Sequence, residues 1–518
     1  MVVMLTDPLA GGAGGPALRD SAGELDWSAL DARVNRWVRL LRAENLQVGD
    51  TMAVVCGNRR ETFEVLLAAL HTGVTVVPVN WHLTAPEITY LLSDSASRLV
   101  LTEPRYAAVV AEAVHSCPAP VRAMVTGERE HAGCTPVEPL LAGLPADEPT
   151  DQVCGSILLY TSGTTGAPKG VRNGLFRVGA PFARVDRLLA YAGRVLGVPA
   201  RGAVLLVGPW YHSAQVFFAL LPLLRGSRLV MHDRFDPESF LAAVAEHRIT
   251  ACHLVPTQFV RLLRLPADVR AAADVGSLRM VWHGGGPCPV EVKRQMIEWW
   301  GPVVVEYYAA TEAGVVTLMD ADSWLRHPGS VGRAVPPNEI VIVDDDGNPL
   351  PAGQAGRVFV HRVGQTFEYH NAPQKTRDAH LRAGVFTYGE TGYLDSDGYL
   401  YLTGRAGDVV ISGGVNIYPA EVQTVLLSHP AVRDAAVTGE PDDEYGERVV
   451  AIVEVDSARL DPERGGEVLA AFCRRSLAGF KVPRRWRFVP ELPRDGTGKL
   501  RQEVLRGLLG TEMSGGRS

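Results

Sequence analysis

The sequence predicts an α/β protein with two domains: a large N-terminal domain of parallel and mixed sheets with helices and a β-barrel-like part, and a small α+β C-terminal domain. Three observations support this fold class. The chain has 518 residues, too many for one hydrophobic core. Short apolar runs alternate with helix-periodic segments as far as about residue 335, which is typical of parallel sheets. Beyond that point, apolar runs are joined by Asp-Gly turns, which are typical of hairpins.

The first elements follow from composition and periodicity. Residues 8–25 are rich in Gly, Ala and Pro, and we expect them to be partly disordered. A helix is expected from Asp26, because apolar residues then recur at helical spacing, and a second helix over residues 61–70. Apolar runs predict strands at residues 51–56, 74–79, 98–101, 156–160, 203–207, 228–231, 251–255 and 280–282.

The sequence pattern changes after about residue 335. Residues 339–343 and 356–360 predict one hairpin, and residues 393–402 a second. The pattern breaks near Arg405–Gly407, so we expect domains over residues 1–404 and 405–518. The elements expected in the second domain are a helix at 419–428, strands at 431–438 and 448–455, a helix at 466–478 and a strand at 484–489.

Composition excludes several classes of protein. The formal net charge is −7, so no general attraction to nucleic acid is expected. The 7 cysteines are scattered and form no C-x-x-C pair, which argues against a disulfide scaffold or zinc module and for a reducing cytosol. No signal peptide is evident at the N-terminus. Residues 202–224 are uncharged and long enough to span a bilayer, but Pro209 and Pro222 favour a buried strand, a loop and a buried helix. We therefore expect a cytoplasmic protein without a transmembrane segment.

The segment Thr161–Gly170 reads Thr-Ser-Gly-Thr-Thr-Gly-Ala-Pro-Lys-Gly. Glycines let backbone N–H groups approach oxygens closely, hydroxyls donate further hydrogen bonds, and Lys169 adds positive charge, so the loop suits a polyphosphate. It is not a Walker A loop, because Lys169 follows Pro168 and no Ser or Thr comes after it. A plain Gly/Ser/Thr turn is the alternative.

Four further segments follow this loop in order along the chain. They are Tyr307–Gly314, Tyr388–Tyr393, Gly404–Glu421 and Pro493–Lys499. Together the five segments resemble the adenylate-forming superfamily of acyl-CoA synthetases, luciferases and adenylation domains. Two other stretches, Pro209–Ser213 and Trp324–Gly332, look most like the fatty-acyl and bile-acid-type CoA ligases of that superfamily. The resemblance implies a carboxylate that attacks the α-phosphate of Mg·ATP, a small domain that then rotates, and a thiol, usually of coenzyme A, that displaces AMP.

The resemblance also implies a role for each motif residue. Thr311, Glu312, His212 and Lys499 would be catalytic, with Lys499 at the junction of carboxylate and phosphate. Glu312 and Thr164 would hold Mg²⁺. Taken singly, Glu312 is as compatible with a surface acid, Tyr308 with a core aromatic and Arg405 with a linker ion pair. The residues implied to bind the nucleotide are Thr161, Ser162, Gly163, Thr164, Thr165, Gly166 and Lys169 for phosphates, Gly284, Gly285, Gly286, Tyr308 and Ala309 for adenine, Glu390 and Arg405 for ribose, and Gly413 and Gly414.

Three positions depart from the family pattern. Ala309 stands where most relatives have Gly. Glu390 stands where Asp is usual, so the carboxylate is kept but lies one methylene further out. At the hinge, Gly407 replaces the common Asp or Lys, and glycine tolerates unusual φ and ψ. We expect a shifted ribose geometry or a weaker affinity from the second change and an easily rotated hinge from the third.

By the same resemblance, the acid pocket is expected to be lined by Trp210, Tyr211, His212, Trp282 and His283. No Asp stands near His212 to bind an ammonium group, which argues against an α-amino acid. The aromatic residues suggest a bulky apolar acid, either polycyclic or a medium-to-long acyl chain. His212 is either a plain wall of the pocket or a gate.

Coenzyme A is the expected acceptor, because only 19 residues follow Lys499 and they contain no phosphopantetheine attachment site (518 − 499). A free carrier protein is the alternative acceptor, and a homodimer is left open. Two other functions stay open: a sensor that binds an adenylate without turnover, which Glu390 and Gly407 could mark, and a luciferase-like oxygenase.

Overall fold

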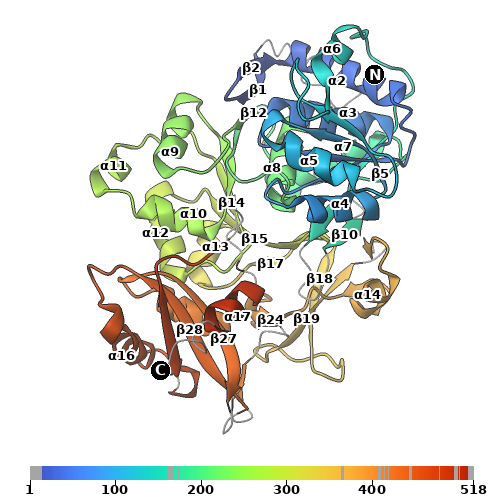
Figure 1. Cartoon of the computed structure of the whole chain (residues 1–518). Coiled ribbons are helices and arrows are strands. Elements are labelled where there is room, and N and C mark those ends of the chain that lie inside the picture. The colour runs from blue at the N-terminus through green and yellow to red at the C-terminus, as the bar shows by residue number, and fades with distance from the viewer. Residues whose placement is uncertain are drawn as a thin grey trace, which may run out of the picture.

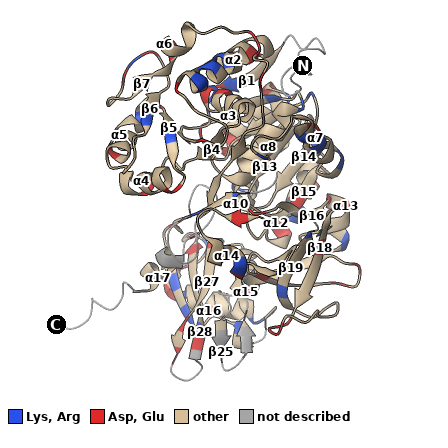
Figure 2. Ribbon diagram, turned by 90° about the vertical axis from the view of Figure 1, so that its right-hand side faces the viewer, with Lys and Arg blue, Asp and Glu red and all other residues tan. Residues whose placement is uncertain are grey.

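The computed structural model describes residues 15–161, 168–172, 176–362, 367–405, 410–412, 415–417, 419–442, 446–477, 479–494, 500 and 502–510. A large N-terminal part runs from blue to yellow in Figure 1, and a smaller C-terminal part, orange to red, lies below it. Figure 2 shows acidic and basic residues spread along both parts. Within these residues, no helix combines the length and apolarity needed to cross a membrane.

The first sheet is a parallel one of six strands in the order β7-β6-β5-β3-β4-β8. Helices between its strands confirm the alternation expected from the sequence. The strands are β3 (Thr51–Val55), β4 (Thr75–Pro78), β5 (Ser97–Thr102), β6 (Arg122–Val125), β7 (Thr135–Pro136) and β8 (Ser156–Ile157), and the helices are α3 (Arg60–Thr72), α4 (Ala85–Asp94), α5 (Ala107–His115) and α6 (Val137–Ala142).

The second sheet has nine strands in the order β17-β16-β15-β14-β13-β11-β12-β1-β2. Its central pairs are parallel, and its edges are antiparallel. The strands are β1 (Pro16–Asp20), β2 (Gly23–Asp26), β11 (Ala203–Leu206), β12 (Arg228–Met231), β13 (Ala251–Leu254), β14 (Met280–His283), β15 (Val304–Ala310), β16 (Gly314–Met319) and β17 (Arg333–Ala334). The helices around it are α8 (Ser213–Leu224), α9 (Pro237–Glu246), α10 (Pro256–Leu263), α11 (Ala267–Ala272), α12 (Val290–Trp300) and α13 (Ala321–Arg326).

One hydrophobic core joins the two sheets. It contains side chains of α2 (Trp27–Ala43), α7 (Ala183–Val195), α8 and strands of both sheets. Asn58 ties the sheets together: its side-chain nitrogen donates to the carbonyls of Gly208 and His232 at 2.9 Å each, and its oxygen accepts from the Trp210 N–H at 3.0 Å. Helix α8 therefore begins beside a fixed backbone turn. This arrangement confirms that residues 202–224 form a strand, a loop and a buried helix.

A β-rich region follows, and both hairpins expected there are confirmed. It is an antiparallel sheet of six strands. Its pairing of β23 with β24 places Glu390 opposite Arg405, the two residues expected at the ribose. The elements are β18 (Asn338–Val343), β19 (Gly356–Arg362), α14 (Pro373–Asp378), β21 (His380–Arg382), β22 (Val385–Phe386), β23 (Glu390–Leu394) and β24 (Leu400–Arg405).

The C-terminal part is a sheet with helices on both faces. Alternate residues of β27 explain this: Ala435 and Val437 pack in a cluster with α15 and α16, whereas Ala436 packs in a cluster with Leu505 of α17. Arg264 of the N-terminal part donates to the Arg433 carbonyl at 2.7 Å. The elements are β25 (Val410–Ser412), β26 (Val415–Ile417), α15 (Pro419–Leu427), β27 (Val432–Asp442), β28 (Gly446–Val455), α16 (Pro462–Cys473), β29 (Arg485–Val489) and α17 (Gln502–Gly510). The boundary at residue 404 stays a prediction.

Two expectations about strands are wrong. Of residues 8–25, expected to be partly disordered, residues 8–14 lie outside the described residues. Residues 16–26 instead form the hairpin β1–β2, because β1 pairs in parallel with the distant β12 and so gains hydrogen bonds that composition does not reveal. The strand expected over residues 156–160 is divided: β8 joins the parallel sheet, and β9 (Leu159–Thr161) joins a separate sheet with β10 (Lys169–Arg172) and β20 (Glu368–Tyr369). Lys169 therefore lies on a strand and not in a loop.

Candidate active site

The candidate site lies at the carboxyl ends of the parallel strands of the nine-stranded sheet. Strand β11 leads through residues 210–212 into α8, β14 leads into residues 284–286, and β15 leads into Thr311 and Glu312. Because the carboxyl ends of parallel strands meet at one edge, these segments converge there. Thr311 Oγ1 donates to Ser213 Oγ at 3.1 Å, which joins the turn after β15 to the start of α8, next to His212.

Tyr369 brings Lys169 and Glu312 together. Its hydroxyl donates to Glu312 Oε1 at 2.8 Å, and Lys169 Nζ lies 5.1 Å from the centre of its ring. The pKa of Lys169 is lowered, chiefly by burial and then by the charge of Lys375, while Glu312 opposes the shift. Tyr369 thus contacts both a cation and a carboxylate. The cation suits phosphate oxygens, and the carboxylate suits a metal ion bound to them.

A second tyrosine holds the carboxylate expected at the ribose. The Tyr308 hydroxyl donates to Glu390 Oε2 at 2.9 Å. The ring of Tyr388 lies 6.3 Å from that of Tyr308, and its pKa is raised well above the ordinary value, mainly by burial. The Tyr388 hydroxyl is buried and has no hydrogen-bond partner among the described residues. Sequence reasoning gave no role to Tyr369 or Tyr388. The only local signal for such a role was an aromatic residue within a motif. Tyr388 has this signal, whereas Tyr369 lies outside the motifs.

The three glycines after β14 are placed by different constraints. A Cβ at Gly284 would lie 2.7 Å from the Tyr307 carbonyl oxygen and 2.8 Å from the Tyr307 ring. Gly285 has a φ of +82°, a conformation that side chains rarely adopt. A Cβ at Gly286 would meet nothing within 4 Å. Packing explains the first glycine and backbone geometry the second, whereas the third leaves open space beside the site.

The residues expected to line the acid pocket differ in exposure. Trp210, Trp282 and His283 have 0% of their surface exposed. The indole N–H of Trp210 donates to the Cys56 carbonyl at 2.7 Å, and that of Trp282 to the Leu196 carbonyl at 2.9 Å. Tyr211 packs edge-on against Trp81, and His212 is partly exposed. Contact between the three buried residues and an acid would require their neighbours to move, so their role stays a prediction.

Comparison with known proteins decides the family. The family model of AMP-binding enzymes matches residues 9–370, and that of the AMP-binding enzyme C-terminal domain matches residues 421–499. The chain belongs to the AMP-binding enzymes. The resemblance to adenylate-forming CoA ligases is confirmed, and so is its activity class: the protein is an ATP-dependent, AMP-forming acid:CoA ligase.

Relatives of this ligase span nearly its whole length. It is 34% identical to a feruloyl-CoA synthase of Amycolatopsis sp, over 95% of both chains. It is 31% identical to the long-chain-fatty-acid–CoA ligase FadD13 of Mycobacterium tuberculosis, over 93% of this chain and 92% of that one. Among solved structures, o-succinylbenzoate CoA synthetase of Bacillus subtilis, in complex with its acyl-adenylate, matches with a TM-score of 0.80 at 27% identity over 98% of both chains.

Several predicted residues of the ligase lie outside the described residues, and Arg405 is described by its backbone alone. Their roles stay predictions, including the catalytic role of Lys499. These residues are Ser162, Gly163, Thr164, Thr165, Gly166, Gly407, Gly413, Gly414 and Lys499.

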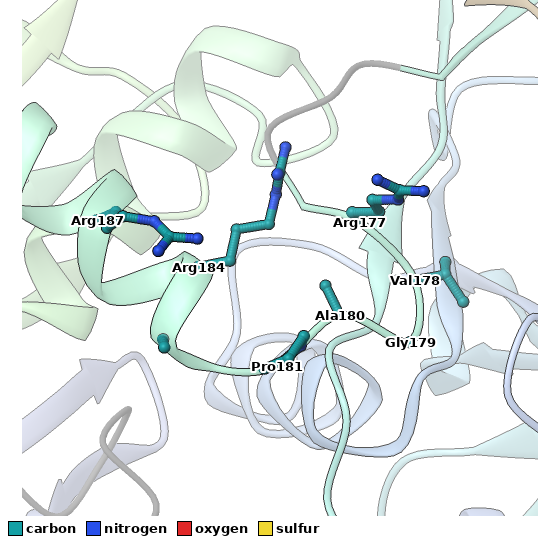
Figure 3. A pocket seen from close by; sticks show the side chains of 8 residues that line it. Arg177, Val178, Gly179, Ala180, Pro181, Arg184 and Arg187 are labelled. Atoms are coloured by element: carbon teal, nitrogen blue, oxygen red, sulfur yellow. The ribbon is translucent and has the colours of Figure 1, made fainter.

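A cavity of about 500 Å³ lies where α7 begins. Figure 3 shows Arg177, Arg184 and Arg187 around it, with Ala180 and Pro181 between them. Its eight lining residues, all within 177–187, include none of those predicted for the active site. The cavity is therefore separate in sequence from the residues that converge on Tyr369.

Proposed function

We propose that this ligase activates an apolar carboxylic acid with Mg·ATP and transfers the acyl group to coenzyme A. The observation that carries the proposal is the convergence of Lys169 and Glu312 on Tyr369, with Thr311 bonded to Ser213, the residue after His212. A carboxylate oxygen is a ligand that Mg²⁺ prefers, so Glu312 fits the metal. When bound, Mg²⁺ would neutralise phosphate charge.

In the first step two anions meet, so charge neutralisation and positioning dominate. A carboxylate oxygen attacks the α-phosphorus, the bond to the bridging oxygen breaks, and pyrophosphate leaves. Lys169 holds the leaving pyrophosphate, Thr311 donates to the α-phosphate, and Lys499 approaches the reacting carboxylate. Tyr308 and Glu390 hold the adenine and the ribose.

In the second step the thiol sulfur of coenzyme A attacks the acyl carbon. A carbon–sulfur bond forms, the carbon–oxygen bond to AMP breaks, and the thiol proton passes to solvent. Rotation of residues 405–518 about Gly407 would replace Lys499 with the thiol between the two steps. A free carrier protein as acceptor, a homodimeric state and a cytoplasmic location are kept as predictions.

The test is product analysis with the purified full-length protein. ATP, Mg²⁺, coenzyme A and a panel of acids should give acyl-CoA, AMP and pyrophosphate in equal amounts, measured by mass spectrometry and a pyrophosphate assay. Glu312→Gln should lower the rate by at least about 100-fold, because the metal loses a charged ligand. Glu368→Gln, an exposed carboxylate on the same short strand as Tyr369, is the matched control and should keep the rate. Formation of ADP, or pyrophosphate release that needs no acid, would contradict the proposal.

A further inference from the structure

The turn that carries Thr311 and Glu312 is bonded to a side chain of another sheet. The turn joins β15 to β16 in the nine-stranded sheet, whereas Arg362 is the last residue of β19 in the six-stranded antiparallel sheet. Arg362 Nη1 donates to the carbonyl oxygen of Ala313, the residue after Glu312, at 2.8 Å. Arg362 and Ala313 are 6% and 8% exposed, so water has little access to this bond. A hydrogen bond from a charged donor is about twice as strong as one between neutral groups.

A second side chain extends this contact to β16. Asn338 is the first residue of β18 and lies opposite Arg362 in the pairing of β18 with β19. Asn338 Oδ1 accepts from Arg362 Nε at 2.6 Å. The amide nitrogen of Asn338 donates to the carbonyls of Val315 and Val316, at 3.1 and 3.2 Å. One buried amide therefore links the guanidinium to the first residues of β16.

These donors reach the hairpin where its own strand pairing is interrupted. The register of β15 on β16 shifts between Tyr308 and Ala309 and leaves Val316 without an opposite residue. Such a bulge disrupts the ladder of hydrogen bonds between two strands. Asn338 donates at the bulge, and Arg362 donates at the turn beyond it. The hairpin is thus held from outside at the place where its own ladder is weakest.

The geometry favours arginine over lysine at position 362. Two nitrogen atoms of one planar group reach two acceptors, the Asn338 oxygen and the Ala313 carbonyl, whereas a lysine offers a single ammonium nitrogen. Burial lowers the pKa of Arg362, while Tyr388 and Tyr191 oppose the shift. A guanidinium keeps its proton in proteins, so both bonds have a charged donor.

We propose that Arg362 and Asn338 are positioning residues for the metal-binding carboxylate of Glu312. They hold the backbone that follows Glu312, and Tyr369 holds its side chain, so the carboxylate is in place before the nucleotide arrives. Partners that orient a metal ligand change metal affinity by about 10–100-fold when they are lost. This inference rests on the proposed function, because Glu312 needs a fixed position only if it binds Mg²⁺.

Nucleotide binding in the presence and absence of metal tests the inference without turnover. Calorimetry on the full-length protein gives the Kd of α,β-methylene-ATP, whose bond between the α- and β-phosphates cannot be broken, in Mg²⁺ and in EDTA. Arg362→Lys keeps the charge but not both hydrogen bonds. It should raise the Kd in Mg²⁺ about 10-fold and leave the Kd in EDTA within about twofold. Asn338→Asp keeps the acceptor for Arg362 but loses the donor to β16, and it should raise the Kd in Mg²⁺ at least about threefold.

A matched arginine on the same strand serves as the control. Arg357 Nη2 donates to the carbonyls of Asp344 and Asp345 at 3.3 Å each, in the turn at the other end of the hairpin β18–β19. Arg357→Lys should change the Kd in Mg²⁺ by less than about twofold. Glu312→Gln removes the carboxylate itself and should raise that Kd at least as much as Arg362→Lys does.

The metal dependence separates positioning from a general loss of structure. Partial unfolding would lower the number of binding sites and leave the Kd of the folded fraction unchanged. The inference is overturned if the Kd in Mg²⁺ stays within about twofold of the wild type in both Arg362→Lys and Asn338→Asp, if it rises equally in EDTA, or if Arg357→Lys raises it as much.

A different result would remove the proposed function's metal site. If the wild type binds the nucleotide equally well in Mg²⁺ and in EDTA, or if Glu312→Gln has no effect, Glu312 does not hold the metal. The inference would then fail together with that part of the proposed function.

Discussion

Replacing the buried Lys293 with methionine should destabilise the ligase strongly. Lys293 Nζ, on α12, donates to Glu306 Oε2 of β15 at 2.5 Å, and the two side chains are 0% and 8% exposed. The variant leaves a buried carboxylate without its cation. Breaking such a pair costs about 3–5 kcal/mol in the free energy of unfolding. The site is affected too, because Glu306 directly precedes Tyr307 and Tyr308.

The destabilisation of Lys293→Met should depend on pH, and the titration of Glu306 determines in which direction. Its pKa is already raised above 4.5, chiefly by burial, while Lys293 opposes the shift. Without Lys293 the folded-state pKa rises further. A carboxyl whose folded pKa is raised favours folding below its unfolded pKa and loses that contribution as pH rises through the folded value. The difference between Lys293→Met and the wild type should therefore be smallest near pH ~5 and grow towards pH ~8.

Urea unfolding followed by tryptophan fluorescence measures this difference at each pH. The double variant Lys293→Met with Glu306→Gln should recover at least about half of the loss, because the unpaired charge is gone. Lys375→Met, an exposed lysine on α14, serves as the control and should stay within about 0.5 kcal/mol of the wild type. A loss in Lys293→Met below about 1 kcal/mol, or one that does not vary with pH, would refute the reasoning.

Three further predictions concern side chains that donate hydrogen bonds. Tyr308→Phe removes the donor that orients Glu390, so the KM for ATP should rise about 10-fold with kcat nearly unchanged. An equal fall in kcat and kcat/KM would count against a binding role. Tyr369→Phe removes the donor to Glu312, so a Mg²⁺ titration should show half-maximal activity at a concentration about 10-fold higher; an unshifted titration would contradict this. Asn58→Ala leaves one buried and one partly buried carbonyl without a donor, so it should lower the free energy of unfolding in urea by about 2–4 kcal/mol; a loss under about 1 kcal/mol would mean that the two sheets hold together without it.

Sequence patterns predicted the parts of the fold that are determined locally. Helix α2 and the hairpins β18–β19 and β23–β24 follow from apolar spacing and turn residues alone. The hairpin β1–β2 was missed because its stabilising partner, β12, lies about 200 residues away. The split between β8 and β9 was missed for a similar reason: one apolar run supplies strands to two sheets, and only the fold decides where it divides.

The site shows the same division. Motif spacing identified Tyr308, Glu312 and Glu390, which the structure places on β15, on the turn after it and on β23. It missed Tyr369, which lies between two motifs and reaches Glu312 only through the strand pairing of β20 with β10. It also missed the hydrogen bonds that join Gln215 to His253 and His253 to Tyr307. These three residues come from separate elements, and none has a local signal in the sequence.

Isotope transfer tests the central claim, an acyl-adenylate formed from ATP, most directly. An acid carrying oxygen-18 in its carboxylate is converted by the ligase with ATP, Mg²⁺ and coenzyme A, and the AMP and pyrophosphate are analysed by mass spectrometry. Attack of the carboxylate on the α-phosphorus predicts one labelled oxygen in each AMP and none in pyrophosphate. Label in pyrophosphate or inorganic phosphate, or unlabelled AMP formed together with acyl-CoA, would contradict the account.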